Sequence, residues 1–311
     1  MSPSDKTAGK ASPAPQQRAR RSVTPIHPRR QSLGAPDADQ ARIEFIGTGD
    51  AAGTPAAGCD CPICREARFN LERCRTPPCA AFSCGEQAIF FDAGDRDLAS
   101  KFARHDVLGL LISHFHPGHV HGLEAIASSP EPVQIFGPPG SKPHPSLSDS
   151  DANLTFTQVL PGEAFELGDA LVTPVLLNHG QITYGYCVEF AGRRVGYLCD
   201  TYELPPRTAD FIAAWKPDAL LIDCNQNPDR PSTEHNAPEQ AFAIHEHCHP
   251  QHSYLMHLGC EVDRWFADHP DALPAGVSLA RDGMVALLGN RVVSKPIVAE
   301  TPSMCQALSP S

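Results

Sequence analysis

The sequence lacks any run that approaches the ~20 consecutive apolar residues of a membrane-spanning helix. Its N-terminal segment carries arginines but lacks the apolar stretch that follows the basic residues of a signal peptide. It also contains no internal repeat. These absences argue against a membrane or secreted protein and predict a cytoplasmic location. With 311 residues, 41% of them hydrophobic, the chain can form one large α/β domain or two small ones.

Positive charge is scarce outside the N-terminus. Residues 1–40 contain seven Lys or Arg and three Asp or Glu, whereas the rest of the chain contains 18 and 33. The first segment is rich in Pro, Ser, Ala and Gln and has no apolar periodicity, so we expect a disordered basic tail. A nucleic-acid or membrane arm is the alternative, but no aromatic or amphipathic residues accompany the charge. The acidic remainder disfavours a nucleic-acid partner for the main domain.

Twelve cysteines are present, and three of them cluster. In a long chain without a signal peptide, metal binding explains clustered cysteines better than disulfides do. Cys59, Cys61 and Cys64 form a Cys-x-Cys-x-x-Cys loop. Three thiolates on one loop need a fourth ligand to close a tetrahedral zinc site.

Residues that can bind metal follow four separate apolar runs. They are His114 after VLGLLIS, His179 after ALVTPVLLN, Asp200 after RVGYLC and His257 after SYLM. We interpret the runs as strands, with helices at 206–215, 237–248, 261–268 and after Gly122. Ligands at strand ends converge when the strands share a sheet, so the pattern predicts one metal centre. A solvated loop position is the usual alternative for an isolated histidine, but it does not explain four such positions.

The run SHFHPGHVHGL contains His114, His116, His119 and His121. In an extended turn, His114 and His116 can reach one metal ion, and His119 can approach a second position. Imidazole binds zinc, copper, iron and nickel alike, so the loop does not name the metal.

This loop resembles the signature of the metallo-β-lactamase fold, His-x-His-x-Asp-His-x-x-Gly-Leu, except that Gly118 stands at the aspartate. Asp92, in FFDAG, resembles the Asp-x-Gly strand end of that fold, which supports the histidine loop. The resemblance implies an α/β fold, an αββα sandwich.

Further segments are similar to the phosphoribosyl cyclic phosphodiesterase (PhnP-type) family that accompanies carbon–phosphorus lyase. They lie within about residues 43–286 and read IGTGDAAGTPAAGCDCPIC, RTPPC, FFDAG, FGPPG, LNHGQITYGY, LCDT, IDC and MHLGC. The cysteine cluster and the LNH…YGY segment are more specific than the histidine loop. The resemblance implies a metal-dependent phosphoric diester hydrolase of phosphonate catabolism. Its substrate would be phosphoribosyl 1,2-cyclic phosphate, opened to ribose bisphosphate.

Carried over by position, the resemblance implies one or two active-site ions, Mn²⁺ or Zn²⁺. The implied ligands are His114, His116 and His179 for the first ion, His119 and His257 for the second, and Asp200 as a catalytic bridge. His235, in TEHNAP, is implied as a general acid or phosphate-binding residue, with an ordinary loop histidine as the alternative. Two such ions lower the pKa of a bridging water towards ~7, and an imidazolium can protonate the leaving sugar oxygen.

The resemblance also implies the fourth zinc ligand. The family places a histidine three residues after its second-site ligand, and here Cys260 stands three residues after His257. We therefore expect a closed structural zinc site formed by Cys59, Cys61, Cys64 and Cys260.

Gly118 leaves three interpretations open. The centre binds two metals with water in place of the carboxylate, or binds one and remains hydrolytic, or binds metal without hydrolysis. A protein of the pyrroloquinoline quinone biosynthesis type, which shares a cysteine-cluster loop, is a further alternative. We expect Gly118→Asp to reach full activity at lower metal concentration, unless glycine holds a backbone angle that aspartate strains.

The predicted organisation is a basic tail at 1–40, a hydrolase domain at 41–294 and a polar tail at 295–311. We expect a small phosphorylated sugar as substrate, no membrane partner, and a homodimer as the assembly if the chain self-associates.

Overall fold

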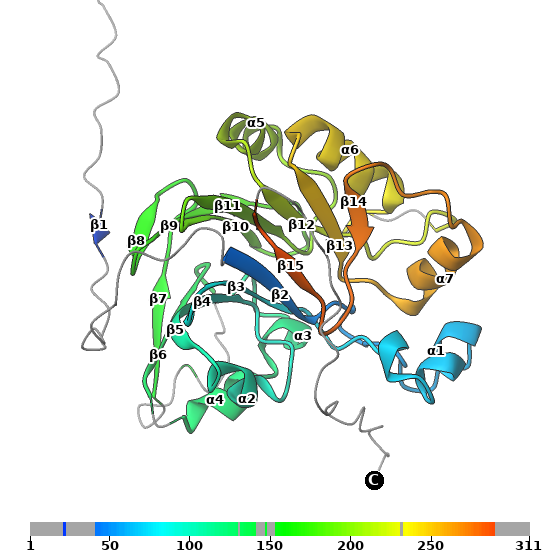
Figure 1. Cartoon of the computed structure of the whole chain (residues 1–311), viewed down its shortest axis with the longest axis horizontal. Helices are drawn as coiled ribbons and strands as arrows, with labels where there is room; N and C mark the ends of the chain where they lie inside the picture. The colour runs from blue at the N-terminus through cyan, green and yellow to red at the C-terminus, as the bar shows by residue number, and fades with distance from the viewer. Residues whose placement is uncertain are drawn as a thin grey trace, which may run out of the picture.

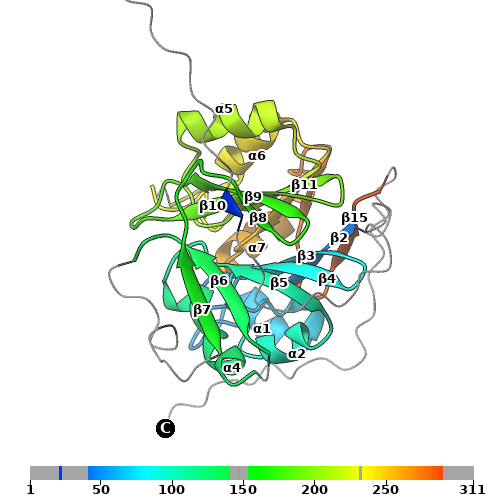
Figure 2. The same ribbon diagram turned by 90° about the vertical axis from the view of Figure 1, so that its left-hand side faces the viewer.

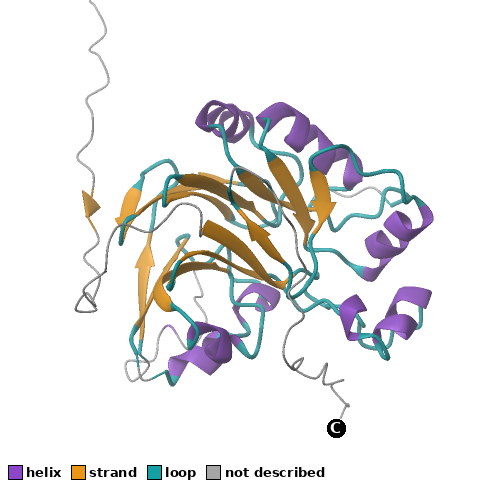
Figure 3. Cartoon of the chain, viewed as in Figure 1, coloured by secondary structure: helices purple, strands orange, loops and turns teal. Residues whose placement is uncertain are grey.

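The computed structural model describes residues 21–22, 41–129, 131–140, 147, 153–230 and 233–289. The predicted tails, residues 1–40 and 295–311, lie outside these residues except for Arg21–Ser22. Two mixed β-sheets stack face to face, and helices cover the outer face of each (Figures 1 and 3). The predicted αββα sandwich is confirmed.

One sheet has eight strands. Its order is β1 (Arg21–Ser22), β8 (Phe165–Leu167), β9 (Ala170–Leu176), β10 (Tyr184–Phe190), β11 (Arg193–Leu198), β12 (Ala219–Asp223), β13 (His252–Met256) and β14 (Val277–Leu279). The strands β11 to β14 run parallel to one another, so β11, β12 and β13 end at the same edge of the sheet.

The other sheet has seven strands. Its order is β15 (Val285–Leu287), β2 (Ala41–Gly47), β3 (Cys79–Cys84), β4 (Gln87–Phe91), β5 (Asp106–Leu111), β6 (Val133–Gly137) and β7 (Leu154–Gln158). The strands β4 and β5 are parallel neighbours, so Asp92 and the histidine loop follow strand ends that lie side by side.

Short helices form the outer layers. They are α1 (Pro62–Ala67), α2 (Leu98–Phe102), α3 (Pro117–Val120), α4 (Leu123–Ala127), α5 (Pro206–Trp215), α6 (Pro238–Cys248), α7 (Cys260–Asp268) and the 3₁₀ helix η2 (Leu71–Arg73). Figure 2 shows α5 and α6 over the eight-stranded sheet, and α2 and α4 beneath the seven-stranded sheet. No helix among the described residues has both the length and the apolar character needed to span a bilayer.

The main core fills the space between the sheets. Alternate residues of β2 are buried, as expected for a strand with one face against a core. Phe91 stacks on Tyr197 with ring centroids 4.9 Å apart, and Phe45 meets Tyr254 at 5.0 Å. Each pair joins one sheet to the other, and full burial of one such side chain contributes roughly 1.5–3 kcal/mol. Rigid sheets therefore fix the strand ends that carry the candidate ligands.

Two further apolar clusters lie outside the sheets. One joins α5, α6 and α7 to the eight-stranded sheet through Ile212, Ile244 and Val262. The other joins α2 and α4 to the seven-stranded sheet through Leu98 and Ile126. These clusters explain why helices of only five to eleven residues are stable here, since isolated helices of that length are marginal in water.

Candidate metal centre

Three strand ends adopt a left-handed backbone where they enter the centre. The φ angles are 54° at Asp92 after β4, 59° at Asp200 after β11 and 60° at His257 after β13. Such angles are uncommon for residues other than glycine and cluster at functional sites. In each case the chain turns sharply at the end of a buried strand.

The Asp200 carboxylate is the centre of the cluster. Its Oδ2 lies 3.4 Å from Nε2 of His114 and 3.6 Å from Nε2 of His179. Its Oδ1 lies 3.3 Å from Nε2 of His119 and 3.3 Å from Nδ1 of His257. Each oxygen therefore faces a different pair of imidazoles. His114 follows β5 of one sheet and His257 follows β13 of the other, and both approach the Asp200 carboxylate. The fold therefore brings together two residues that are 143 positions apart.

His116 completes the group on the Oδ2 side. Its Nδ1 lies 2.8 Å from Nε2 of His114 and 3.4 Å from Nε2 of His179. Ligand atoms of His114, His116, His179 and Asp200 all lie within 4.8 Å of one another. Four converging nitrogen and oxygen donors are the set that a transition-metal ion prefers. We call this group the first position.

His119 and His257 face the other oxygen of Asp200, which we call the second position. Nδ1 of His119 lies 2.7 Å from Oδ2 of Asp92, which leaves Nε2 facing Asp200. Asp92 is fixed by Ser113, which donates from its backbone N and Oγ, and by the Tyr197 hydroxyl at 2.8 Å. Metal-binding histidines commonly donate their second N–H to such a carboxylate.

Asp223, at the end of β12, orients two more imidazoles. Its Oδ1 lies 3.1 Å from Nδ1 of His257, and its Oδ2 lies 3.0 Å from Nδ1 of His235. Sequence reasoning assigned Asp223 no role, although it ends an apolar run like the predicted ligands. Nε2 of His257 is buried and has no hydrogen-bond partner among the described residues. A buried imidazole nitrogen without a partner, held by a carboxylate on its other side, fits a metal ligand.

The two carboxylates of Asp92 and Asp200 favour a positive charge on His119, which lies between them. Burial lowers the pKa of His119, but the Asp200 and Asp92 carboxylates outweigh burial and raise it to about 10. Burial raises the pKa of Asp200, but His119 and His257 hold it well below its usual value. Burial lowers the pKa of His114 well below its ordinary value, which keeps it neutral. His114 neutral and Asp200 ionised are the protonation states that bind a cation, whereas a metal ion bound by His119 would replace the proton that this imidazole otherwise holds.

His235 lies beside the cluster on the loop before α6. Its ring centroid is 5.2 Å from that of His179 and 5.0 Å from that of His257. Burial lowers its pKa, but Asp223 outweighs burial and raises it to about 9. The structure therefore places His235 at the centre, where the resemblance put a general acid. Its role stays a prediction.

The four cysteines named for the structural zinc site come together. Sulfur atoms of Cys59, Cys61, Cys64 and Cys260 lie within 4.8 Å of one another. The Cys59 and Cys260 sulfurs are 3.9 Å apart. In a tetrahedral site with Zn–S bonds of about 2.3 Å, sulfur atoms are about 3.8 Å apart. The spacing fits zinc, and the ligand roles stay predictions.

A family model for a beta-lactamase superfamily domain matches residues 89–258, more than half of the chain. The chain belongs to the beta-lactamase superfamily. The matched segment contains all the predicted histidine and aspartate ligands, together with Asp92 and Asp223.

Individual relatives are distant. An octanoyltransferase from Porphyromonas gingivalis is 22% identical over 80% of this chain and 52% of its own length. A ribonuclease Z from Methanopyrus kandleri is 32% identical over 32% of this chain and 39% of its own length. The chain thus spans about half or less of the length of these curated relatives.

Solved structures share the fold. A diphosphatase of the PhnP family is 22% identical, with a TM-score of 0.67, and covers 82% of this chain and 100% of its own. Zinc-bound PqqB from Methylobacterium extorquens is 20% identical, with a TM-score of 0.62, and covers 78% of this chain and 99% of its own.

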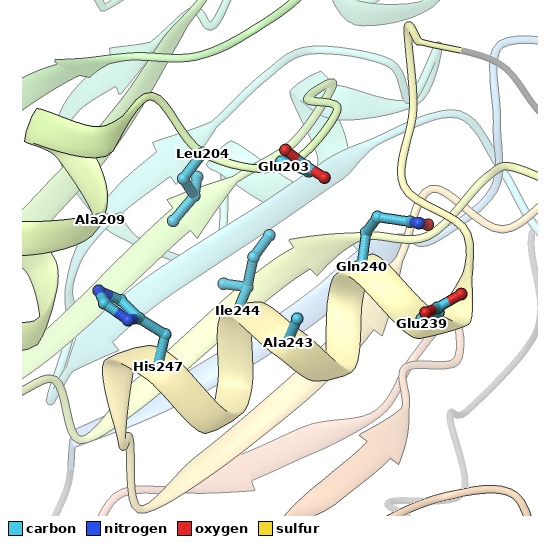
Figure 4. Close-up of a pocket in the computed structure, with 8 residues that line it drawn as sticks. All are labelled: Glu203, Leu204, Ala209, Glu239, Gln240, Ala243, Ile244 and His247. Carbon is cyan, nitrogen blue, oxygen red and sulfur yellow. The ribbon is translucent and has the colours of Figure 1, made fainter.

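A cavity of about 260 Å³ lies between α5 and α6 (Figure 4). Its lining combines Leu204, Ala243 and Ile244 with Glu203 and Glu239. None of the candidate ligands lines this cavity. The candidate functional site is therefore the group of polar side chains that converge at the strand ends, and not this cavity.

The loop after β2 occupies the space beside Gly118. A Cβ added at Gly118 would lie 2.8 Å from Cβ and 2.9 Å from Cα of Ala51. Gly118 lies within α3 and does not have the left-handed φ that favours glycine. The obstacle to a side chain is therefore contact with Ala51, and the expectation of a special backbone angle is wrong.

Gly118→Ala should test this contact. Alanine gains up to about 1 kcal/mol of helix propensity, but overpacking against backbone typically costs about 1–3 kcal/mol. We expect a net loss of unfolding free energy in a urea titration. Gly289→Ala is the control, because no atom lies within 4 Å of a Cβ added there. Equal stability of the two variants would contradict close packing of Ala51 on Gly118.

Proposed function

We propose that this protein is a metal-dependent phosphodiesterase that opens a small cyclic phosphate, with phosphoribosyl 1,2-cyclic phosphate as the preferred substrate. The observation that carries the proposal is Asp200, whose two oxygens face two separate groups of imidazoles. The likeness in fold to a diphosphatase of the PhnP family supports a phosphate-containing substrate. The choice of sugar rests on the resemblance alone.

Two divalent ions held by these residues would polarise the phosphoryl oxygens and lower the pKa of a shared water towards ~7. Asp200 faces both positions and would contribute one carboxylate oxygen to each. As water oxygen bonds to phosphorus and the ring P–O bond breaks, the leaving sugar oxygen needs a proton. His235 would donate it: Asp223 accepts from Nδ1, so Nε2 would be the nitrogen that protonates the substrate.

The test is hydrolysis of phosphoribosyl 1,2-cyclic phosphate by full-length protein with saturating Mn²⁺ or Zn²⁺, followed by ³¹P NMR. We expect conversion of the cyclic diester into a monoester. His235→Gln should lower kcat by ~10²-fold or more, as for loss of a general acid. Wild-type protein that binds metal but leaves the diester intact would support the non-hydrolytic interpretation instead.

A further inference from the structure

The loop that fills the space beside Gly118 carries a carboxylate of its own. Asp50 directly precedes Ala51, the residue that contacts Gly118. Its Oδ1 accepts hydrogen bonds from the backbone N of Ala52 and of Gly53, at 3.0 and 2.9 Å. These two bonds fix the turn and the direction of the carboxylate. Oδ2 makes no hydrogen bond to any described residue, so one carboxylate oxygen remains available.

Oδ2 of Asp50 points towards the strand end that carries His257. A Cβ added at Gly259, two residues after His257, would lie only 2.7 Å from this oxygen. Burial raises the pKa of Asp50, and the opposing effects of His257 and His235 only partly offset this rise. Both imidazoles therefore lie within electrostatic reach of the carboxylate. His257 belongs to the second position, for which the family resemblance implies an aspartate at residue 118, where this chain has glycine.

The loop is held rigidly against this strand end. Gly49 pairs with Leu258 in an isolated parallel bridge, and the N of Leu258 donates to the carbonyl of Thr48 at 2.9 Å. On the other side, the N of Gly49 donates to the carbonyl of Thr76, and that of Thr54 to the carbonyl of Arg75, each at 2.8 Å. Backbone hydrogen bonds on both sides of the loop therefore fix the position of Asp50.

We propose that Asp50 supplies to the second metal position, from the loop after β2, the carboxylate charge that Gly118 does not provide. Ala51 takes the space of the missing side chain, and Asp50 brings a negative charge to the same position from the neighbouring residue. A carboxylate favours a divalent cation through its charge as well as its lone pairs. The inference rests on the proposed two-metal centre but not on its substrate.

The test is Mn²⁺ binding to full-length protein with zinc already in the cysteine site, measured from the electron paramagnetic resonance signal of free Mn²⁺. Manganese suits carboxylate oxygens and not thiolates, so it does not compete for the cysteine site. We expect wild type to bind two equivalents. Asp50→Asn should weaken the looser equivalent by ~10-fold or more, in the range seen for carboxylates around metal sites. The tighter equivalent should change by less than ~2-fold. Asparagine keeps the oxygen that Ala52 and Gly53 bond.

Asp95→Asn is the matched control. Asp95 also accepts from the backbone N two residues ahead, and burial also raises its pKa, but the charges that act on it are those of Lys101 and Asp97. The Asp95→Asn variant should bind both equivalents of Mn²⁺ with the affinities of wild type. Unchanged binding in Asp50→Asn, or a single equivalent in wild type, would overturn the proposal. Because no substrate is used, wild type that binds two ions without hydrolysing the diester would refute the proposed function alone.

Discussion

Asp200→Asn is expected to lower kcat/KM for the cyclic phosphate by about 10³-fold, more than any other single change at the metal centre. Both oxygens of Asp200 lie within 3.6 Å of imidazole nitrogens of the two positions. An amide removes the charge shared by both positions and turns one oxygen into a donor. A loss of about 4 kcal/mol of transition-state stabilisation, reasonable for a metal-bridging charge, corresponds to that factor.

The substitution should leave the fold intact. Asn has nearly the shape of Asp and tolerates the left-handed φ of 59° at this position. Asp210→Asn, on the exposed side of α5, serves as the control for loss of one charge. Activity and metal content should be measured together by steady-state kinetics and elemental analysis. Full activity in Asp200→Asn with retained metal would exclude Asp200 as the bridging group.

The convergence of the candidate ligands could be predicted from the sequence because these residues follow strong local signals. His114, Asp200 and His257 each follow an apolar run that forms a buried strand, and parallel strands end at one edge. Asp223 ends a run of the same kind and orients two imidazoles of the centre. The same signal could have found it, but the sequence does not say whether a strand-end carboxylate faces a metal or a histidine.

The contact between Ala51 and Gly118 could not be predicted in the same way. The two residues are 67 positions apart: Ala51 lies in a turn after β2, and Gly118 lies in the four-residue helix α3. Their contact depends on the sharp turn fixed by Asp50 and on the pairing of Gly49 with Leu258. The sequence alone therefore reveals that position 118 has no carboxylate. The structure adds that Ala51 occupies the space that a side chain at position 118 would need.

Some helices of the outer layers can be predicted from the sequence, and others cannot. The segments 206–215, 237–248 and 261–268 were predicted within a residue of α5, α6 and α7. The short helices α1, α2 and α3 were not predicted, because four to six residues give little periodicity to recognise, although α4, of five residues, matches the helix predicted after Gly122. They are stabilised by packing, which local sequence does not reveal.

The second large effect concerns the cysteine site. Cys260→Ser is expected to remove tightly bound zinc and to lower the free energy of unfolding by about 3 kcal/mol or more, as loss of a structural metal does. Cys260 is the first residue of α7. Cys59 and Cys61 lie in the loop that leads into α1, and Cys64 lies within α1. The two helices lie side by side (Figure 1). A zinc ion bound by all four sulfurs would join segments about 200 positions apart.

An ion pair already connects the same regions, which limits the expected loss. Arg75 donates to both carboxylate oxygens of Asp263 in α7, at 2.6 and 2.8 Å, and its side chain is buried. We therefore expect partial destabilisation rather than unfolding. For a domain of this size, about 3 kcal/mol corresponds to a fall in Tm of roughly 6–12 °C.

Cys74→Ser is the control for loss of a thiol near the site. Cys74 is buried, and its Sγ donates to the carbonyl of Ala67 at 3.3 Å, a hydrogen bond that serine can replace. We expect one equivalent of chelator-resistant zinc in wild type and in Cys74→Ser, and none in Cys260→Ser, by elemental analysis after dialysis. Thermal denaturation should place Cys74→Ser near wild type. Zinc retained in Cys260→Ser with unchanged Tm would show that these sulfurs converge without binding a structural ion.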